Sequence, residues 1–221
     1  MTKWILPVLI LWLSCTSAAQ PTQRQLRTFE FNGRKINYVI TLPSSYDPSK
    51  TYPVAIGPSD ASDSNDQSFY WRDTDDTYGW ILIDFPLHKG EQFKEVVSSF
   101  LSFINEHYKV EGKKFHVICF SANSANTFDL VMATPESFHS IMGIAGNPGT
   151  RDIDKLSKLK NVKVRFVVGD QDSYWMSAAK DRNARMKEAG VNSEIEIIKD
   201  GQHVLKQFVG YGILSRLDKV R

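Results

Sequence analysis

The chain has 221 residues, which is enough for one large α/β domain that buries its core without the help of disulfides or metal ions. Hydrophobic residues make up 42% of the sequence and charged residues 24%, a composition that excludes a disordered chain. The 27 basic and 25 acidic residues nearly cancel, whereas nucleic-acid binding needs a concentrated basic face. We therefore expect no nucleic-acid partner.

The first nineteen residues differ from the rest and predict a secretory signal peptide. Lys3 supplies a positive start, residues 4–13 form an apolar run, and Ser17 to Ala19 provide the small residues of a cleavage site. A membrane-spanning helix needs about twenty apolar residues, so we expect no membrane span. Cleavage after Ala19 would leave residues 20–221 as a single exported domain, either periplasmic or secreted.

Cys15 offers an alternative, a lipoprotein signal in which this cysteine becomes the acylated N-terminus and anchors the protein to lipid. Such signals usually carry Leu three residues before the cysteine, and this chain has Trp12 there. Cleavage after Ala19 is therefore the leading interpretation. It would leave Cys119 as the only thiol, so no intramolecular disulfide could form and packing alone would stabilise the domain.

The rest of the chain alternates between predicted strands and predicted helices. Residues 24–41 predict a β-hairpin, because alternating side chains lead into and out of Asn32-Gly33, the dipeptide that best fits a two-residue hairpin turn. Further strands are predicted at 52–56, 80–84, 115–120, 141–145, 162–168 and 193–198. Helices are predicted at 90–108, 122–133 and 173–189, with a last one from about residue 204.

Strands that alternate with helices in this way are typical of βαβ crossovers and of a mainly parallel sheet. We therefore expect a three-layer α/β fold with the antiparallel hairpin at the leading edge of the sheet. Active sites of such sheets lie beyond the carboxyl ends of the strands, so the loops that follow each strand are the places to look for chemistry.

The strand at 115–120 ends at Ser121, and a helix is predicted to begin at once. This arrangement predicts a tight turn that exposes the serine hydroxyl above a helix N-terminus. The usual pattern for such a nucleophile is G-x-S-x-G, and here the residues are Cys119-Phe120-Ser121-Ala122-Asn123. Cysteine is small, and asparagine tolerates unusual backbone angles. Taken alone, Ser121 is equally well explained as the N-cap of the helix.

Two further loops carry polar groups of the right kind. Asp170 and Asp172 follow the strand at 162–168, where a carboxylate can reach an imidazole or simply cap the next helix. Gly201 allows a sharp turn before His203, which could also be an ordinary surface histidine. Ser121, Asp172 and His203 nevertheless follow one another in the chain order of the α/β-hydrolase triad.

With these residues the sequence resembles the α/β-hydrolase superfamily, and it looks most like secreted esterases related to polyhydroxybutyrate depolymerases and feruloyl esterases. The resemblance runs from about Thr41 to the C-terminus. Its markers are Leu42-Pro43-Ser44-Ser45-Tyr46, Tyr52-Pro53, Tyr78-Gly79-Trp80, the Ser121 turn, Gly169 to Asp172 and Gly201 to His203. It implies a serine hydrolase that cleaves carboxylic esters without metal or cofactor. Ser121 would be the nucleophile, His203 the general base and then acid, and Asp172 the group that orients the imidazole.

The resemblance also implies an oxyanion hole formed by the backbone N–H of Ala122 and by another from the loop after the strand at 52–56. Related enzymes usually have His-Gly in that loop, whereas this chain has Gly57-Pro58-Ser59-Asp60. Proline has no N–H, so Ser59 or Asp60 would be the second donor. Two alternatives stay open: a peptidase on the same triad, and a non-catalytic binding protein on a hydrolase fold, which the altered loop favours.

Many α/β-hydrolases carry a lid after the strand that follows the nucleophile helix. Here only about sixteen residues separate the strands predicted at 141–145 and 162–168, which is too few for a lid domain. The site should therefore be open, and an open site suits a bulky or polymer-attached ester.

The acidic loop before the second parallel strand has two further interpretations. Asp60, Asp63, Asn65 and Asp66 suggest a calcium site, but the EF-hand pattern fails because Ser68 stands at its glycine position and Thr74 at its last ligand position. We expect a solvated loop and no metal. The aromatic residues of this region (Phe69, Tyr70, Trp71 and Trp80) are interpreted as packing residues, with Tyr70 or Trp71 as candidates for the border of the pocket.

Overall fold

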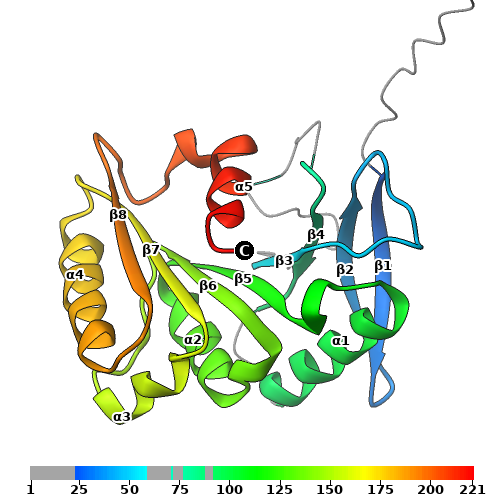
Figure 1. The fold of residues 1–221 in the computed structure, drawn as a ribbon, viewed down its shortest axis with the longest axis horizontal. Coiled ribbons are helices and arrows are strands. Elements are labelled where there is room, and N and C mark those ends of the chain that lie inside the picture. Colours follow the sequence, from blue (N-terminus) through cyan, green and yellow to red (C-terminus); the bar gives the residue numbers. More distant parts are fainter. Residues whose placement is uncertain (1–22, 59–70, 72–76, 88–91) are drawn as a thin grey trace, which may run out of the picture.

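The structure, a computed structural model, describes residues 23–58, 71, 77–87 and 92–221. Within this part of the chain, strands form one sheet in the order β1-β2-β4-β3-β5-β6-β7-β8 (Figure 1). β1 (Gln23–Phe31) and β2 (Arg34–Leu42) form the expected antiparallel hairpin. Its turn consists of Asn32 and Gly33, both with positive φ, as a two-residue hairpin turn requires.

The hairpin joins the sheet through β2, which pairs antiparallel with β4 (Ile81–Phe85). All the other neighbouring pairs are parallel. Their strands are β3 (Val54–Pro58), β5 (Phe115–Phe120), β6 (Phe138–Ile144), β7 (Lys163–Gly169) and β8 (Ser193–Ile198). The helices are α1 (Phe93–His107), α2 (Ser124–Ala133), α3 (Ile153–Leu156), α4 (Ser173–Glu188) and α5 (Tyr211–Asp218).

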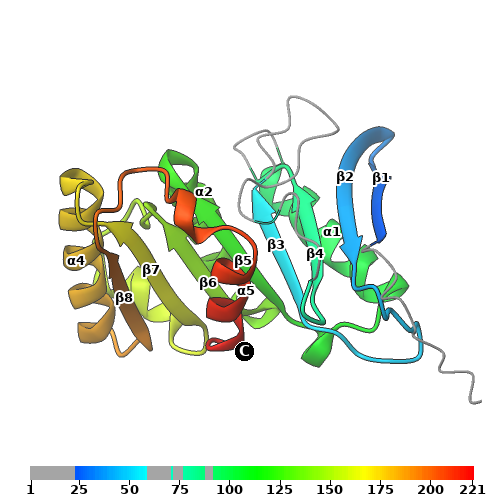
Figure 2. The ribbon, with the colours of Figure 1, turned by 90° about the horizontal axis from the view of Figure 1, so that it is seen from above.

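Two apolar cores lie on opposite faces of the sheet. The larger one joins the sheet to α1, α2, α3 and α4 and includes Phe100, Phe128 and Met186. The smaller one joins the other face to α5 and includes Trp80 and Leu214. In Figure 1, α5 lies above the sheet and α1, α2 and α3 lie below it; Figure 2 looks down on α5. The predicted three-layer α/β fold is therefore confirmed.

The apolar sequence of β5 explains its place in the middle of the sheet. Because side chains alternate along a strand, Phe115 and Val117 enter the larger core while Ile118 enters the smaller one. Cys119 is free and fully buried, and burial raises the pKa of its thiol. This cysteine is therefore a packing residue held in its neutral form.

The last helix begins later than the sequence predicts. Leu205 is buried in the smaller core, Lys206–Phe208 forms a single 3₁₀ turn, and Gly210 has a positive φ of 57° just before α5 begins at Tyr211. A helix starting at residue 204 is therefore wrong, because burying Leu205 and turning at Gly210 require an irregular backbone. As a result, His203 lies on a loop.

A partly buried cluster of charged side chains attaches α5 to the sheet. Glu196 of β8 accepts hydrogen bonds from Arg165 of β7 at 2.8 Å and from Arg216 of α5 at 2.6 Å. Burial alone would raise the pKa of the Glu196 carboxyl, but the hydrogen bonds from Arg216 and Arg165 outweigh it and lower the pKa. The Arg216 guanidinium also lies 4.0 Å from the centre of the Phe208 ring. Arg216 therefore holds the end of the connection between His203 and α5 that lies next to α5.

Between β6 and β7 the described chain contains only α3 and a single 3₁₀ turn, Ser157–Leu159, and no lid. Among the described helices, none has the length and apolar character needed to cross a bilayer.

Candidate active site

Ser121 stands at a sharp turn directly after β5. Its φ of 53° lies in the left-handed region, which is strained for a residue with a side chain. The 3₁₀ turn Ser121–Asn123 then leads straight into α2, and the structure shows no side-chain cap at the start of either segment. The interpretation of Ser121 as a simple N-cap therefore fails, and the geometry is that of a strand-to-helix turn that projects a hydroxyl beyond the sheet.

The three candidate residues come together through two hydrogen bonds. Ser121 Oγ lies 3.0 Å from His203 Nε2, and His203 Nδ1 lies 2.6 Å from Asp172 Oδ2. Asp172 occupies the N-cap position of α4, yet its side chain makes no cap hydrogen bond there. Of the two acidic residues in this loop, Asp170 is exposed and Asp172 is the one that reaches the imidazole.

This arrangement determines what the imidazole can do. A carboxylate only accepts hydrogen bonds, so the proton between Asp172 and His203 belongs to Nδ1. Nε2 then carries a lone pair that faces the Ser121 hydroxyl. The Asp172 side chain is only 11% exposed, which keeps water from competing for this bond. The His203 imidazole can therefore remove the proton from the Ser121 hydroxyl and turn its oxygen into a nucleophile.

Aromatic side chains surround the imidazole. The ring centres of Phe120 and Trp175 lie 5.1 Å and 5.9 Å from that of His203. Tyr174 packs edge-on against Trp175 and is 73% exposed. Trp175 was not predicted as a site residue, because no pattern in the sequence indicates its contact with a side chain 28 positions away. These rings restrict the space in which the imidazole can turn.

Ser124, the next hydroxyl along the chain, is buried and already engaged. It donates to the carbonyl oxygen of Ser121 at 2.6 Å and accepts from the N–H of Asn147 at 2.8 Å. A Cβ added to Gly146 would lie 2.8 Å from Ser124 Cβ. Ser124 therefore ties the Ser121 turn to the loop after β6 and is not available as a nucleophile.

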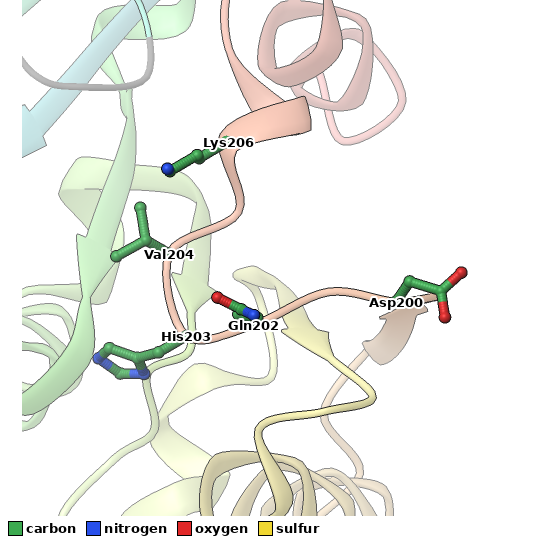
Figure 3. A pocket seen from close by; sticks show the side chains of 5 residues that line it. All are labelled: Asp200, Gln202, His203, Val204 and Lys206. Carbon is green, nitrogen blue, oxygen red and sulfur yellow. The ribbon is translucent and has the colours of Figure 1, made fainter.

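A pocket of about 480 Å³ opens beside His203, lined by Asp200, Gln202, His203, Val204 and Lys206. In Figure 3 the His203 ring and the Lys206 amine project to the same side of the loop, whereas the Asp200 carboxylate points the opposite way. The pocket therefore lies beside the imidazole, on the loop that follows β8.

Of the expected oxyanion donors, only Ala122 lies in the described part of the chain. It follows Ser121 in the first helical turn, where backbone N–H groups have no partner within the helix. β3 is described as far as Pro58, so Ser59, Asp60 and the remaining calcium candidates lie outside the described residues. Among the residues that are described, no three His, Cys, Asp or Glu side chains are grouped as they would be around a metal ion.

Both tryptophans assigned to packing are buried. Trp71 is 1% exposed and donates its indole N–H to Asp84 at 3.0 Å. Trp80 is fully buried and donates to Asp218 of α5 at 2.9 Å. Their interpretation as packing residues is supported, and Trp71 is not among the described residues that line the pocket beside His203. Tyr70, the other candidate for the border, lies outside the described residues.

No protein-family model matches the sequence, and no curated protein sequence matches it. Solved structures do match. A thermostable esterase superposes with a TM-score of 0.61 at 12% identity, over 89% of this chain and 59% of its own. A candidate dipeptidyl aminopeptidase IV from Bacteroides ovatus gives 0.66 at 12% identity, over 91% and 36%. A ferulic acid esterase from Anaeromyces mucronatus, solved with ferulic acid, gives 0.67 at 12% identity, over 90% and 91%.

These similarities establish an α/β-hydrolase fold, in agreement with the resemblance seen in the sequence. The chain spans 59% of the thermostable esterase and 36% of the aminopeptidase, but 91% of the ferulic acid esterase.

Proposed function

We propose that this protein is a serine hydrolase that cleaves carboxylic esters, with Ser121 as nucleophile, His203 as general base and acid, and Asp172 as the group that orients the imidazole. The observation that carries the proposal is the continuous chain of hydrogen bonds from Ser121 through His203 to Asp172. The strained backbone of Ser121 adds support, because such strain is kept where a site needs it.

The reaction would proceed in two halves. His203 Nε2 takes the proton as Ser121 Oγ attacks the ester carbonyl carbon, and Asp172 stabilises the imidazolium that forms. The Ala122 N–H would donate to the oxyanion of the tetrahedral intermediate. His203 then returns the proton to the leaving alcohol oxygen, which leaves an acyl group on Ser121. Water, activated by the same imidazole, releases the acid and restores the serine hydroxyl.

The leaving alcohol must lie near His203, because the imidazole has to protonate its oxygen. The pocket of Gln202, Val204 and Lys206 is therefore the place for the alcohol part of the substrate. Since the described chain has no lid there, a bulky or polymer-attached alcohol fits this site.

A peptidase would use the same three residues, and one of the matching structures is a candidate aminopeptidase. The ester reaction is favoured because the chain spans 91% of the ferulic acid esterase and only 36% of that aminopeptidase. The direct test compares hydrolysis of p-nitrophenyl acetate with that of aminoacyl p-nitroanilides by the purified protein. We expect hydrolysis of the ester and none of the anilides; no turnover of either would instead support a binding protein on a hydrolase fold.

We also propose that residues 1–19 direct export to the periplasm or the medium and are then removed. Expressed in a bacterium with its leader, the protein should leave the cytoplasm and begin at Gln20, as N-terminal sequencing and mass spectrometry would establish. A lipid on Cys15 would support the lipoprotein alternative, and an uncleaved cytoplasmic chain beginning at Met1 would contradict both.

A further inference from the structure

Two glycines bring the loops of Asp172 and His203 into direct backbone contact. Gly169 is the last residue of β7, three residues before Asp172, and Gly201 lies two residues before His203. A Cβ added to Gly169 would lie 2.0 Å from the carbonyl oxygen of Gly201 and 2.7 Å from that of Gln202. A Cβ added to Gly201 would lie 2.8 Å from Gly169 Cα. Neither position can hold a side chain unless the loops separate.

Backbone hydrogen bonds continue the pairing of β7 and β8 into this contact. Gly169 is paired with Ile198 at the end of the two strands. Beyond it, the Asp170 N–H donates to the Ile198 carbonyl at 3.0 Å, and the Gln171 N–H donates to the Gly201 carbonyl at 2.9 Å. These hydrogen bonds hold the backbone on both sides of the contact in place. A change in the distance between Gly169 and Gly201 would therefore shift Asp172 and His203, which follow them.

Space, and not backbone angle, is what requires glycine here. Gly169 and Gly201 have no left-handed φ, unlike Gly33 or Gly210. Alanine at either position can therefore keep the backbone conformation of the glycine, and the only new requirement is space for one methyl group.

We propose that Gly169 and Gly201 are positioning residues that set the separation of Asp172 from His203. The proposal rests on the proposed function only for its catalytic consequence, since the contact itself is structural. The separation concerned is that of the hydrogen bond between His203 Nδ1 and Asp172 Oδ2, which is 2.6 Å long. A shift of the Gly201 loop would lengthen this bond. Losing it would release the imidazole from the orientation in which Nε2 faces Ser121.

The test uses Gly169→Ala, Gly201→Ala and the control Gly149→Ala, whose added methyl would meet only the Ala125 side chain, at an ordinary 3.4 Å. We expect Gly169→Ala to lower kcat for p-nitrophenyl acetate by about 100-fold with KM within about threefold, since a displacement near 1 Å has that effect. Gly201→Ala should lower kcat less, because its added Cβ would come no nearer than 2.8 Å to another atom, whereas at Gly169 the nearest atom would be 2.0 Å away. Gly149→Ala should match the wild type.

A second readout does not depend on catalysis. A proton shared between His203 Nδ1 and a carboxylate gives a far-downfield ¹H NMR resonance, which His203→Ala would assign by its absence. We expect this resonance in the wild type and in Gly149→Ala, and its loss or upfield shift in Gly169→Ala with cooperative melting retained. If Gly169→Ala does not fold, the same resonance measured in Gly201→Ala tests the proposal.

An unchanged resonance in the folded glycine variants would overturn the proposal, whatever their kcat. A wild type that shows the resonance but hydrolyses no ester would contradict the proposed function alone, and the positioning role would then be judged from the resonance.

Discussion

Replacing His203 by alanine is expected to lower kcat for ester hydrolysis by about 10⁴-fold or more. His203 is the only group within hydrogen-bond reach of Ser121 Oγ in the described site that can accept a proton, at 3.0 Å. Without it, the attacking hydroxyl stays protonated, and no base activates the water that must release the acyl group from Ser121. Steady-state kinetics with p-nitrophenyl acetate measures the effect.

Two further variants make this result specific. Asp172→Asn should lower kcat by roughly 10⁴-fold, because an amide can donate to Nδ1 and so favour the wrong imidazole tautomer. His107→Ala is the matched control: its ring is exposed, and its Nδ1 lies 2.8 Å from the Phe103 carbonyl oxygen, one turn back in α1. A His203→Ala variant that keeps more than about a tenth of the wild-type kcat would contradict the assigned role.

Stability should fall steeply in mild acid because of a second, unrelated histidine. His116 of β5 is fully buried, its Nδ1 lies 2.8 Å from Ser140 Oγ, and the edge of Trp80 packs against it. Burial, with smaller contributions from His139, Arg221 and Lys163, lowers the pKa of His116 to about 3. His116 is therefore neutral in the folded protein.

The sign of the effect follows from which state binds the proton. The unfolded chain takes up a proton on His116 near pH 6.5, and the folded protein only near pH 3, so acid favours unfolding between these values. The loss approaches about 1.4 kcal/mol per pH unit within this window. His116→Gln should remove this loss, so that between pH 7 and pH 5 the wild type loses about 2 kcal/mol more than the variant.

Urea unfolding at several pH values measures this difference. Between pH 7 and pH 8 the two proteins should change in parallel, because His116 is then almost uncharged in both states. Equal loss of stability by both proteins between pH 7 and pH 5 would show that His116 is not the responsible group.

Much of the fold could be predicted because its signals are local. β5 and β8 match the predicted ranges 115–120 and 193–198, since strands in a parallel sheet read as short apolar or alternating runs. The start of α5 was not predictable in this way. Burial of Leu205 by distant residues decides the backbone between His203 and Tyr211.

The candidate site could be predicted in part for the same reason. Ser121 was recognisable from the strand that ends before it, but the choice between Asp170 and Asp172 depends on how the loop turns after Gly169. The packing of Trp175 beside His203 joins residues 28 positions apart, and no local pattern reports such a contact. The contact of Gly169 with Gly201 could not be predicted from the sequence either, because it depends on the register in which β7 pairs with β8.

The most direct test of the account is covalent labelling with a fluorophosphonate, which reacts with an activated serine hydroxyl. Intact-mass analysis of the wild type should show one adduct, and peptide mapping should place it on Ser121. Ser121→Ala should remain unlabelled, because the nearby Ser124 is buried and hydrogen-bonded to Ser121 and Asn147. Labelling that survives in Ser121→Ala, or a wild type that does not react, would contradict Ser121 as the nucleophile.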